Sequence, residues 1–421
     1  MTSMASPPES STQPPSSADG AEKTRFSEFE LIPPQLLRAI DEAGFEYCTP
    51  IQAQSLIHTL HGLDVAGQAQ TGTGKTAAFL ITIFAGLINH PLDEERYSGE
   101  PRALVLAPTR ELALQIAKDA EQLGRYLGLR TAALVGGMDY QRQRAALQQG
   151  LIDLVVATPG RLIDFIENRE IFLDQIEILV LDEADRMLDM GFLPQIRRVI
   201  RQTPRKEHRQ TLLFSATLNA DIMQLAEQWM VDARWIEAVR SPQNAGAVKQ
   251  EIYLLADHQK STVLINLLHR FAGQRVIVFA NRRDRTRHLE EKLARHGLKV
   301  GMLSGDVPQV KRLKTLEAFR AGKLDVMVAT DVAGRGIHID DIALVINYDL
   351  PEEAEDYVHR VGRTGRAGAT GHSISFASEH DAFELPKIEQ LLGLKIDAHQ
   401  PEEALLQPVR PQAQRNRTAT D

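Results

Sequence analysis

The feature that most constrains the fold is a repeated alternation of short apolar runs with longer amphipathic segments. Such runs of Val, Ile, Leu and Ala are typical of parallel strands that helices bury on both faces. In the first half we predict strands at Ala103–Ala107, Thr131–Val135, Leu154–Ala157, Ile178–Leu181 and Leu212–Ser215. In the second half we predict them at Val276–Ala280, Lys299–Leu303, Val326–Ala329, Leu344–Asn347 and Ser373–Ala377. The pattern predicts an α/β fold with two domains, each a mostly parallel sheet covered by helices.

The domain boundaries follow from length and local composition. A chain of 421 residues suits two ordinary domains plus tails. Residues 1–25 are mostly Ser, Pro, Thr and Gln in their first part, so we expect a disordered arm there. Residues 239–250 contain Pro, Gly and Asn without a helical period and are predicted to be a linker, and 398–421 a flexible tail. The domains are then expected at 26–238 and 251–397.

Composition limits the class of protein. No apolar run reaches the roughly 20 residues that a membrane helix needs, and the N-terminus does not resemble a signal sequence, so we expect a cytoplasmic protein without a membrane partner. The net charge of −8 disfavours indiscriminate electrostatic binding to nucleic acid. Any such binding must come from a local site. The single cysteine, Cys48, has no activating neighbour in the sequence and is interpreted as a small buried side chain.

A glycine-rich loop, AQTGTGKT, lies between a short apolar run at 64–66 and a predicted helix at Lys75–Leu87. Glycines let the backbone N–H groups curl around phosphate oxygens at the start of a helix. Lys75 is expected to neutralise the β- and γ-phosphates, and the Thr76 hydroxyl to hold Mg²⁺. The strict motif has Gly where this chain has Ala69. The predicted phosphate-binding residues are Ala69, Gln70, Thr71, Gly72, Thr73, Gly74, Lys75 and Thr76.

Two carboxylates follow the predicted strand that ends at Leu181, in the sequence LVLDEAD. Ligands of parallel sheets bind at the carboxyl ends of the strands, so this position is a favourable one for a site. We predict Asp182 as the Mg²⁺ ligand and Glu183 as the general base that accepts a proton from the attacking water. A solvated acidic turn before a helix is the plain alternative. The presence of Lys75 in the same chain argues against that alternative.

Eleven short motifs, in order, resemble those of the DEAD-box RNA helicases of superfamily 2, over roughly residues 26–394. They are GFEYCTPIQ, AQTGTGKT, PTRELA, GG, TPGR, DEAD, SAT, VIVFAN, QVKR, ATDVAGRG and HRVGRTGR. The resemblance implies two RecA-like domains, with a Q motif at 26–54 and the DEAD box at 182–185. It also implies an RNA-stimulated ATPase that uses ATP and Mg²⁺. Members of this family tolerate Ala69 in the phosphate loop.

The resemblance also implies roles at the nucleotide that spacing alone does not give. Gln52 would read the adenine edge, Phe26 would pack near the base and Asp331 would contact the ribose. Arg363 and Arg366 would be arginine fingers that reach the γ-phosphate from the second domain. The residues implied to couple the two sites are Asp185, Ser215, Thr217 and His359. Taken from the residues alone, Phe26 equally suits a hydrophobic anchor, and the arginines a solvated basic patch.

The remaining motifs fall at predicted strand ends and helix starts, where backbone N–H groups and hydroxyls can hold phosphates. The resemblance implies that they grip a single RNA strand or short duplex without regard to base sequence. The residues implied are Pro108, Thr109, Arg110, Gly137, Thr158, Pro159, Gly160, Arg161, Arg312 and Thr330. Ordinary helix capping by Thr109 and Thr158, beside surface arginines, is the structural alternative.

Two departures from the family pattern, Gly334 and His338, narrow the resemblance. With His338 and the short sequences CTPIQ and GHSIS, the chain most resembles the bacterial member that belongs to the RNA degradosome. This implies local unwinding of short duplexes during mRNA degradation, with a degradosome endoribonuclease as partner. The tail carries only Arg410, Arg415 and Arg417, short of the strongly basic tail associated with that member. A DNA-stimulated translocase and an ATP-gated RNA clamp or scaffold remain alternatives.

Overall fold

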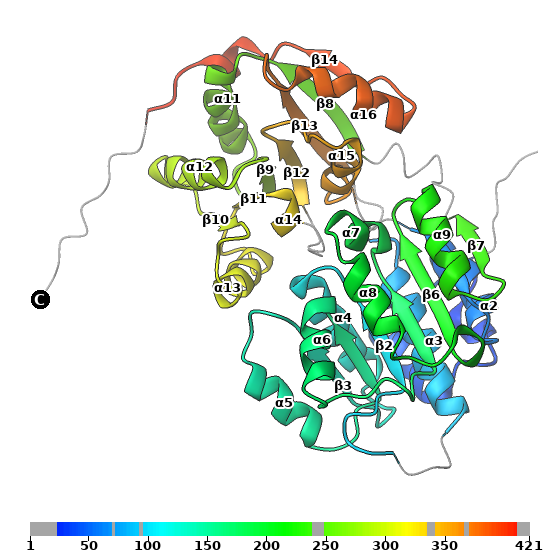
Figure 1. Cartoon of the computed structure of the whole chain (residues 1–421). Helices are drawn as coiled ribbons and strands as arrows, with labels where there is room; N and C mark the ends of the chain where they lie inside the picture. Colours follow the sequence, from blue (N-terminus) through cyan, green and yellow to red (C-terminus); the bar gives the residue numbers. More distant parts are fainter. Residues whose placement is uncertain are drawn as a thin grey trace, which may run out of the picture.

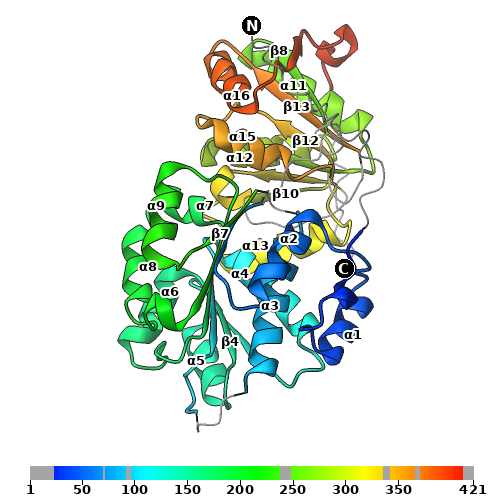
Figure 2. The ribbon, with the colours of Figure 1, turned by 90° about the vertical axis from the view of Figure 1, so that its right-hand side faces the viewer.

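The strands form two separate seven-stranded sheets in the computed structural model, which describes residues 23–69, 72–91, 96–237, 248–334, 342–365 and 370–410. Figures 1 and 2 show one domain above the other, each with helices on both sides of its sheet. Every pairing between named strands is parallel. The predicted α/β architecture with two mostly parallel sheets is therefore confirmed.

The sheet of the first domain has the order β3-β4-β2-β5-β6-β1-β7. Its strands are β1 (Val65–Gln68), β2 (Ala103–Leu106), β3 (Thr131–Leu134), β4 (Leu154–Ala157), β5 (Ile178–Leu181), β6 (Gln210–Ser215) and β7 (Arg234–Glu237). Its helices are η1 (Phe26–Glu28), α1 (Pro34–Glu42), α2 (Pro50–Thr59), α3 (Lys75–Asn89), α4 (Arg110–Leu123), α5 (Tyr140–Gln148), α6 (Pro159–Glu167), α7 (Ala184–Asp189), α8 (Leu193–Ile200), η2 (Lys206–His208) and α9 (Ala220–Trp229).

Neighbouring residues of the central strands enter two different cores, as the two-residue period of a strand requires. Val65 packs with the buried side chains of α2, α3 and α4, whereas Ala66 packs with those of α6, α8 and α9. Strands β2, β4 and β5 are buried along their whole length. Helix α3 is apolar nearly all round because it lies between the sheet and α2 and α4. This burial fixes the start of α3, where the phosphate loop ends.

The sheet of the second domain has the order β10-β11-β9-β12-β13-β8-β14. Its strands are β8 (Val248–Leu254), β9 (Arg275–Phe279), β10 (Val300–Leu303), β11 (Val326–Ala329), β12 (Ile342–Asn347), β13 (Gly371–Ala377) and β14 (Asp397–His399). Its helices are α11 (Asp257–Arg270), α12 (Arg283–Arg295), α13 (Gln309–Arg320), α14 (Asp331–Gly334), α15 (Ala354–Val361), η3 (Ala382–Glu384), α16 (Leu385–Leu392) and η4 (Glu403–Leu406). One core lies under α11 and α12, and two smaller ones lie under α13 and under α15 and α16.

All ten predicted strands occur, each within two residues of its predicted ends. The predicted helix after the phosphate loop also forms, as α3. The short apolar run at 64–66 before the phosphate loop also forms a strand, β1, whereas β7, β8 and β14 were not predicted. Within the described ranges, no helix combines the length and the apolarity that crossing a bilayer requires.

The structure differs from the predicted domain ends in two places. Strand β8 begins at Val248, so the last three residues assigned to the linker belong to the second sheet. The predicted tail contains most of β14 and the turn η4, whose Leu405 is buried, so ordered structure continues beyond 398. Residues 1–22, 238–247 and 411–421, which include most of the predicted arm and linker and the last part of the predicted tail, lie outside the described residues.

Candidate active site

The phosphate loop joins β1 to α3, and its glycines have the backbone that the sequence requires. Gly72 and Gly74 have φ of 87° and 91°, in the left-handed region that favours glycine. A Cβ atom on Gly74 would lie 2.5 Å from the Nε2 atom of Gln52, so the close approach also demands glycine there. The N–H of Ala69 donates to the Ser215 carbonyl at 2.8 Å. Gln70 and Thr71 lie outside the described residues.

Lys75 and Asp182 form a buried ion pair at the centre of the first-domain site. The distance from Lys75 Nζ to Asp182 Oδ1 is 2.6 Å, and both residues are buried. Burial acts to lower the pKa of Lys75, but the carboxylates of Asp182 and Glu183 outweigh it and hold the pKa above its ordinary value. Asp182 Oδ2 is buried and makes no hydrogen bond within the described part of the chain. A carboxylate oxygen with this freedom beside a phosphate loop fits Mg²⁺, which prefers oxygen ligands.

Glu183 has an unusual backbone conformation for its residue type. Its φ of 52° and ψ of 53° place it in the left-handed region, at the N-cap of α7. Such a conformation costs of the order of 1 kcal/mol for a residue other than glycine and is concentrated at functional sites. The Glu183 side chain lines a cavity together with Lys75 and with His359 and Arg363 of the second domain. The cavity is thus built from both domains, with the predicted base on its wall.

Asp185 connects the DEAD box to the SAT motif through four hydrogen bonds. Its Oδ2 atom accepts from the N–H groups of Ala216 and Thr217, each at 3.0 Å, and from the Thr217 hydroxyl at 3.3 Å. Its own N–H donates to the Ser215 hydroxyl at 3.2 Å. The two motifs are therefore in direct hydrogen-bonded contact. The coupling roles of these residues remain a prediction.

The second domain presents Arg363 and His359 to the same cavity. Arg363 is 2% exposed, and its Nε donates to the His359 carbonyl at 3.1 Å. Burial lowers the pKa of His359, and the carboxylates of Asp185 and Glu183 oppose this effect. Burial also lowers the pKa of Arg363, against the charge of Glu183. Arg366, the second predicted finger, lies outside the described residues.

Arg360, the remaining arginine of HRVGRTGR, serves inside the second domain. Its guanidinium holds both Asp331 oxygens, at 2.6 and 2.7 Å, and donates to the Asp349 carbonyl at 2.7 Å. Arg360 is therefore an internal anchor and not part of a solvated basic patch. The carboxylate of Asp331, for which ribose contact is predicted, is held in place by this pair.

Gln52 and Phe26 lie at the predicted adenine end of the site. Gln52 Oε1 accepts from the Thr49 N–H at 2.8 Å, and its Nε2 donates to the Gly74 carbonyl at 3.0 Å. An amide has two donors and two acceptor lone pairs, so one of each remains for a base edge. Phe26 is 2% exposed and packs in the first-domain core with Ile32 and Leu36. That burial favours the anchor interpretation of Phe26 over a base contact.

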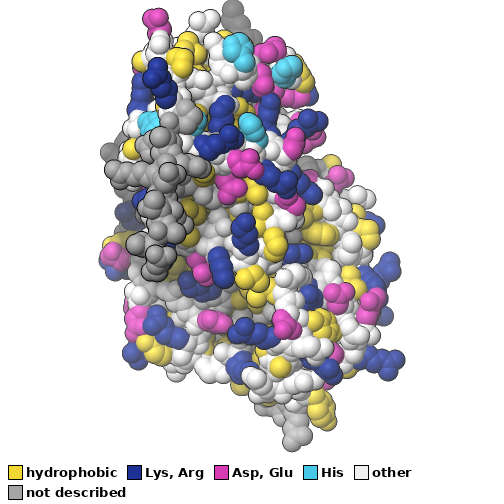
Figure 3. All heavy atoms as spheres, turned by 90° about the vertical axis from the view of Figure 1, so that its left-hand side faces the viewer, with side chains coloured by type: hydrophobic (Ala, Val, Ile, Leu, Met, Phe, Trp, Pro, Cys, Tyr) yellow, Lys and Arg dark blue, Asp and Glu magenta, His cyan; other side chains and the backbone are white. Residues whose placement is uncertain are grey.

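The residues predicted to bind RNA gather at helix starts and strand ends. The structure places Pro108, Thr109 and Arg110 at the start of α4, Gly137 in the turn after β3, Thr158, Pro159, Gly160 and Arg161 at the start of α6, Arg312 in α13 and Thr330 after β11. The Thr109 hydroxyl accepts from the Leu112 N–H at 3.3 Å, so it caps α4 as the structural alternative proposed. Thr158 makes no such bond. On the face of the molecule seen in Figure 3, Lys and Arg are interspersed with acidic side chains.

Arg312 joins the two domains in this structure. Its Nη2 atom lies 3.0 Å from Oε1 of Glu111 in α4, and the same oxygen accepts from Gln309 Nε2 at 2.8 Å. Figure 2 shows α13 beside α4. We call Glu111, Gln309 and Arg312 the interdomain latch. The charge of Arg312, predicted for RNA, is neutralised by a first-domain carboxylate, and its RNA contact remains a prediction.

Two family models match the chain, each over one domain. Residues 49–225 match the DEAD/DEAH box helicase model, and residues 259–368 match the helicase conserved C-terminal domain. The ATP-dependent RNA helicase RhlB of Pseudomonas aeruginosa is 58% identical over 92% of this chain and 97% of its own length. The protein of the same name from Xanthomonas oryzae is 50% identical over 91% of this chain and 67% of its own.

The chain belongs to the RhlB family of DEAD-box RNA helicases. Among solved structures, Mss116p bound to single-stranded RNA and AMP-PNP has a TM-score of 0.81 at 27% identity, over 92% of this chain and 82% of that one. Yeast Dbp5 bound to RNA and ADP BeF3 has a TM-score of 0.77 at 30% identity, over 89% of this chain and 95% of that one. A Methanococcus jannaschii DEAD-box protein has a TM-score of only 0.51 at 34% identity, over 89% and 98%. Structural likeness to this RhlB-family chain thus does not follow sequence identity.

The sequence did not indicate two residues of this RhlB-family helicase, one in the cavity and one in the interdomain latch. Arg186 follows the DEAD box directly and lines the same cavity, and its Nε and Nη2 atoms are buried without a hydrogen bond in the described part of the chain. Glu111 lies within PTRELA and is the first-domain residue of the interdomain latch, where it contacts Gln309 and Arg312. The signal for Arg186 was its position beside two carboxylates. Nothing local to the sequence indicates the partner of Glu111.

From the interdomain latch we predict that substitutions of Glu111 and Arg312 have non-additive effects on the rate of RNA-stimulated ATP hydrolysis. We expect Glu111→Gln and Arg312→Gln each to lower the RNA-stimulated rate, by about tenfold, because closure loses an interdomain ion pair. The double variant should lose less than the product of the two single losses. ATPase rates at saturating RNA measure this. Glu121→Gln, on the exposed side of α4, is the matched control and should combine additively with Arg312→Gln. Additive losses for Glu111 and Arg312 would contradict the latch.

Proposed function

We propose that the chain is an ATP-dependent RNA helicase that separates short RNA duplexes locally by coupling ATP hydrolysis to closure of its two domains. The observation that carries the proposal is the cavity where Lys75 and Glu183 of the first domain face Arg363 of the second. A phosphate loop alone would suit many nucleotide-binding proteins. A site completed only by the second domain suits an enzyme that converts hydrolysis into domain movement.

The residues divide the chemistry of hydrolysis between the domains. Lys75 neutralises the phosphates, and Glu183 accepts the proton of the attacking water. The Thr76 hydroxyl and Asp182 would hold Mg²⁺, which supplies positive charge against the phosphate oxygens. Arg363 stabilises the charge on the transferring phosphoryl group, and we assign the same task to Arg366. Gln52 selects the adenine base and Asp331 orients the ribose.

RNA binding is assigned to the helix starts of α4 and α6, the Gly137 turn and the facing part of the second domain. Backbone N–H groups and hydroxyls there suit phosphates and 2′-hydroxyls, which carry no base sequence. The two RNA-bound relatives support this proposal, because their domain arrangement gives high TM-scores with this chain. Binding that favours the closed form shifts the population toward it, and closure would bend one strand out of a short duplex.

The biological role that we propose is assistance in mRNA degradation in the cytoplasm, with a degradosome endoribonuclease as partner. The support is the 57–58% identity with proteins named RhlB from Pseudomonas, together with His338, which lies two residues after the ATDVAGRG motif. An endoribonuclease that cuts single strands needs duplexes opened first. Local strand separation would supply such substrates.

The test is steady-state ATP hydrolysis by the full chain with no nucleic acid, with single-stranded RNA and with single-stranded DNA of the same sequence. We expect RNA to raise the rate at least tenfold and DNA to have little effect. Equal stimulation by both would favour a translocase on DNA. RNA binding that depends on ATP without stimulated hydrolysis would favour the clamp. Separation of a labelled short duplex, measured in the same samples, checks unwinding.

A further inference from the structure

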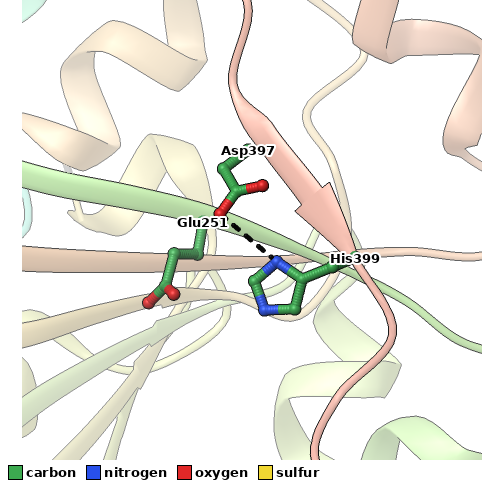
Figure 4. A group of neighbouring side chains, drawn as sticks. All are labelled: Glu251, Asp397 and His399. Carbon is green, nitrogen blue, oxygen red and sulfur yellow. Dashed lines mark ion pairs between the residues drawn. The ribbon is translucent and has the colours of Figure 1, made fainter.

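A group of metal-ligating side chains lies in the second domain, outside the proposed active site. Figure 4 shows Glu251 on β8 with Asp397 and His399 on β14. One ligand atom from each lies within 4.8 Å of the other two. Among the described residues this is the one group of three or more His, Cys, Asp or Glu side chains found at such distances.

Strand register explains why these side chains meet. Asp397 pairs with Glu251 across β14 and β8, and Ile374 pairs with Glu251 across β13 and β8. Paired residues, and residues two apart along a strand, share one face of a sheet. His399 therefore lies on the face of Asp397, and His372 on the face of Ile374. Three adjacent strands thus bring two carboxylates and two imidazoles onto one face.

The contacts within the group follow a pattern found around bound metals. His372 Nε2 lies 2.5 Å from Glu251 Oε2, and His399 Nδ1 lies 3.5 Å from Asp397 Oδ2. Carboxylate–histidine pairs of this kind orient ligands and raise their basicity. Burial acts to raise the pKa of Glu251, but hydrogen bonds from Lys249 and His372 hold it below its ordinary value.

Lys249 balances the negative charge of Glu251 in this structure. Its Nζ atom lies 3.0 Å from Glu251 Oε1, yet its side chain is 68% exposed, so little holds it there. The Asp397 side chain is 75% exposed, whereas the whole of Glu251 is only 8% exposed. A divalent cation would displace the lysine, and the exposed Asp397 and half-buried His399 would close onto it around the buried Glu251. Ligand atoms in a tetrahedral zinc site lie about 3.4 Å apart, so the required movement is small.

We propose that Glu251, Asp397 and His399, with His372 as fourth ligand or orienting partner, form a Zn²⁺ site that fastens β14 to β8. Mixed imidazole and carboxylate ligands suit Zn²⁺, whereas Mg²⁺ prefers oxygen ligands alone in an octahedral arrangement. The site would stabilise the C-terminal part of the domain. After β14 the chain returns to α11, where the Asn266 amide donates to the Leu405 carbonyl at 2.7 Å. This inference does not depend on the proposed helicase activity.

The test is calorimetric titration of the metal-free full chain with Zn²⁺, together with thermal unfolding. We expect one Zn²⁺ per chain at micromolar affinity and a rise in Tm of about 2–4 °C, because the cation binds only the folded state. Asp397→Asn and His399→Ala should each weaken binding at least tenfold. The Asp397 side chain is 75% exposed and the His399 side chain is 41% exposed, so neither change empties a buried core position and neither should prevent folding. Mg²⁺ at the same concentration should give no rise.

Two further variants separate a metal site from a set of surface ion pairs. Lys249→Ala removes the competing cation and should tighten Zn²⁺ binding several-fold, whereas it would merely weaken an ion-pair network. His380→Ala is the matched control, since His380 pairs with Glu379 at 3.8 Å on an exposed surface, outside the group. Its Zn²⁺ affinity should be unchanged. Absence of stoichiometric binding, or equal affinity in His399→Ala and the unaltered chain, overturns the proposal.

Discussion

Glu183→Gln should bind ATP and RNA normally while its ATP hydrolysis falls by roughly 10²–10⁴-fold, the usual contribution of a general base. The substitution keeps the shape of the side chain but removes its ability to accept a proton. It also removes a negative charge from the cavity that Lys75 shares, so phosphate binding should not weaken. Single-turnover hydrolysis at saturating RNA gives the rate, and binding of a fluorescent ATP analogue gives the affinity.

The RNA complex of Glu183→Gln should also outlive that of the unaltered chain, because hydrolysis no longer releases the closed state. Glu121→Gln removes an exposed carboxylate from the same domain and should behave like the unaltered chain. Steady-state hydrolysis by Glu183→Gln at the ordinary rate would remove Glu183 from the role of base. The assignment would then pass to another group of the cleft.

Arg363→Ala should lower RNA-stimulated hydrolysis by roughly 10³-fold or more, as expected for an arginine finger, with only a small change in ATP affinity. The reason is geometric. Arg363 belongs to the second domain, yet it lines one cavity with Lys75 and Glu183 of the first. It can therefore act on the transferring phosphoryl group only after closure. Rates with and without RNA measure the effect, which should be much larger with RNA.

Arg363 is nearly fully buried, so its removal could act through folding instead. Arg363→Lys keeps a positive charge and tests this, because a finger needs the planar guanidinium and the lysine variant should also be slow. Thermal unfolding of both variants, beside the exposed α12 control Arg295→Ala, reports stability. A slow enzyme with unchanged Tm supports the finger. Full activity of Arg363→Lys would contradict it.

The sequence predicted the buried strands and missed those that tertiary contact creates. Strands β2, β4 and β5 are continuous apolar runs, because both faces are covered. In β7 only Ile236 is buried, so no run marks it. Strand β14 has three residues, of which the first and last are polar, and forms because β8 offers a free edge. No local pattern encodes such pairing.

The nucleotide site was predicted more completely than the contacts between domains. The phosphate loop and the DEAD box each follow a strand, so local motif and local structure agree for Lys75 and Asp182. Arg312 instead lies about two hundred residues from its partner Glu111. Their meeting depends on how two separately folded domains are placed. Sequence spacing carries no information about that placement.

The ion pair between Lys75 and Asp182 has a consequence for the order of ligand binding. A nucleotide that arrives alone would draw Lys75 toward its phosphates and leave the buried Asp182 carboxylate without its cationic partner. A divalent cation that arrives alone would sit beside Lys75 and be repelled by it. Each ligand therefore removes the electrostatic cost that binding of the other creates, so the nucleotide and the cation bind with positive thermodynamic linkage. The Lys75–Asp182 pair thus discriminates against a nucleotide without its cation and against a cation without its nucleotide.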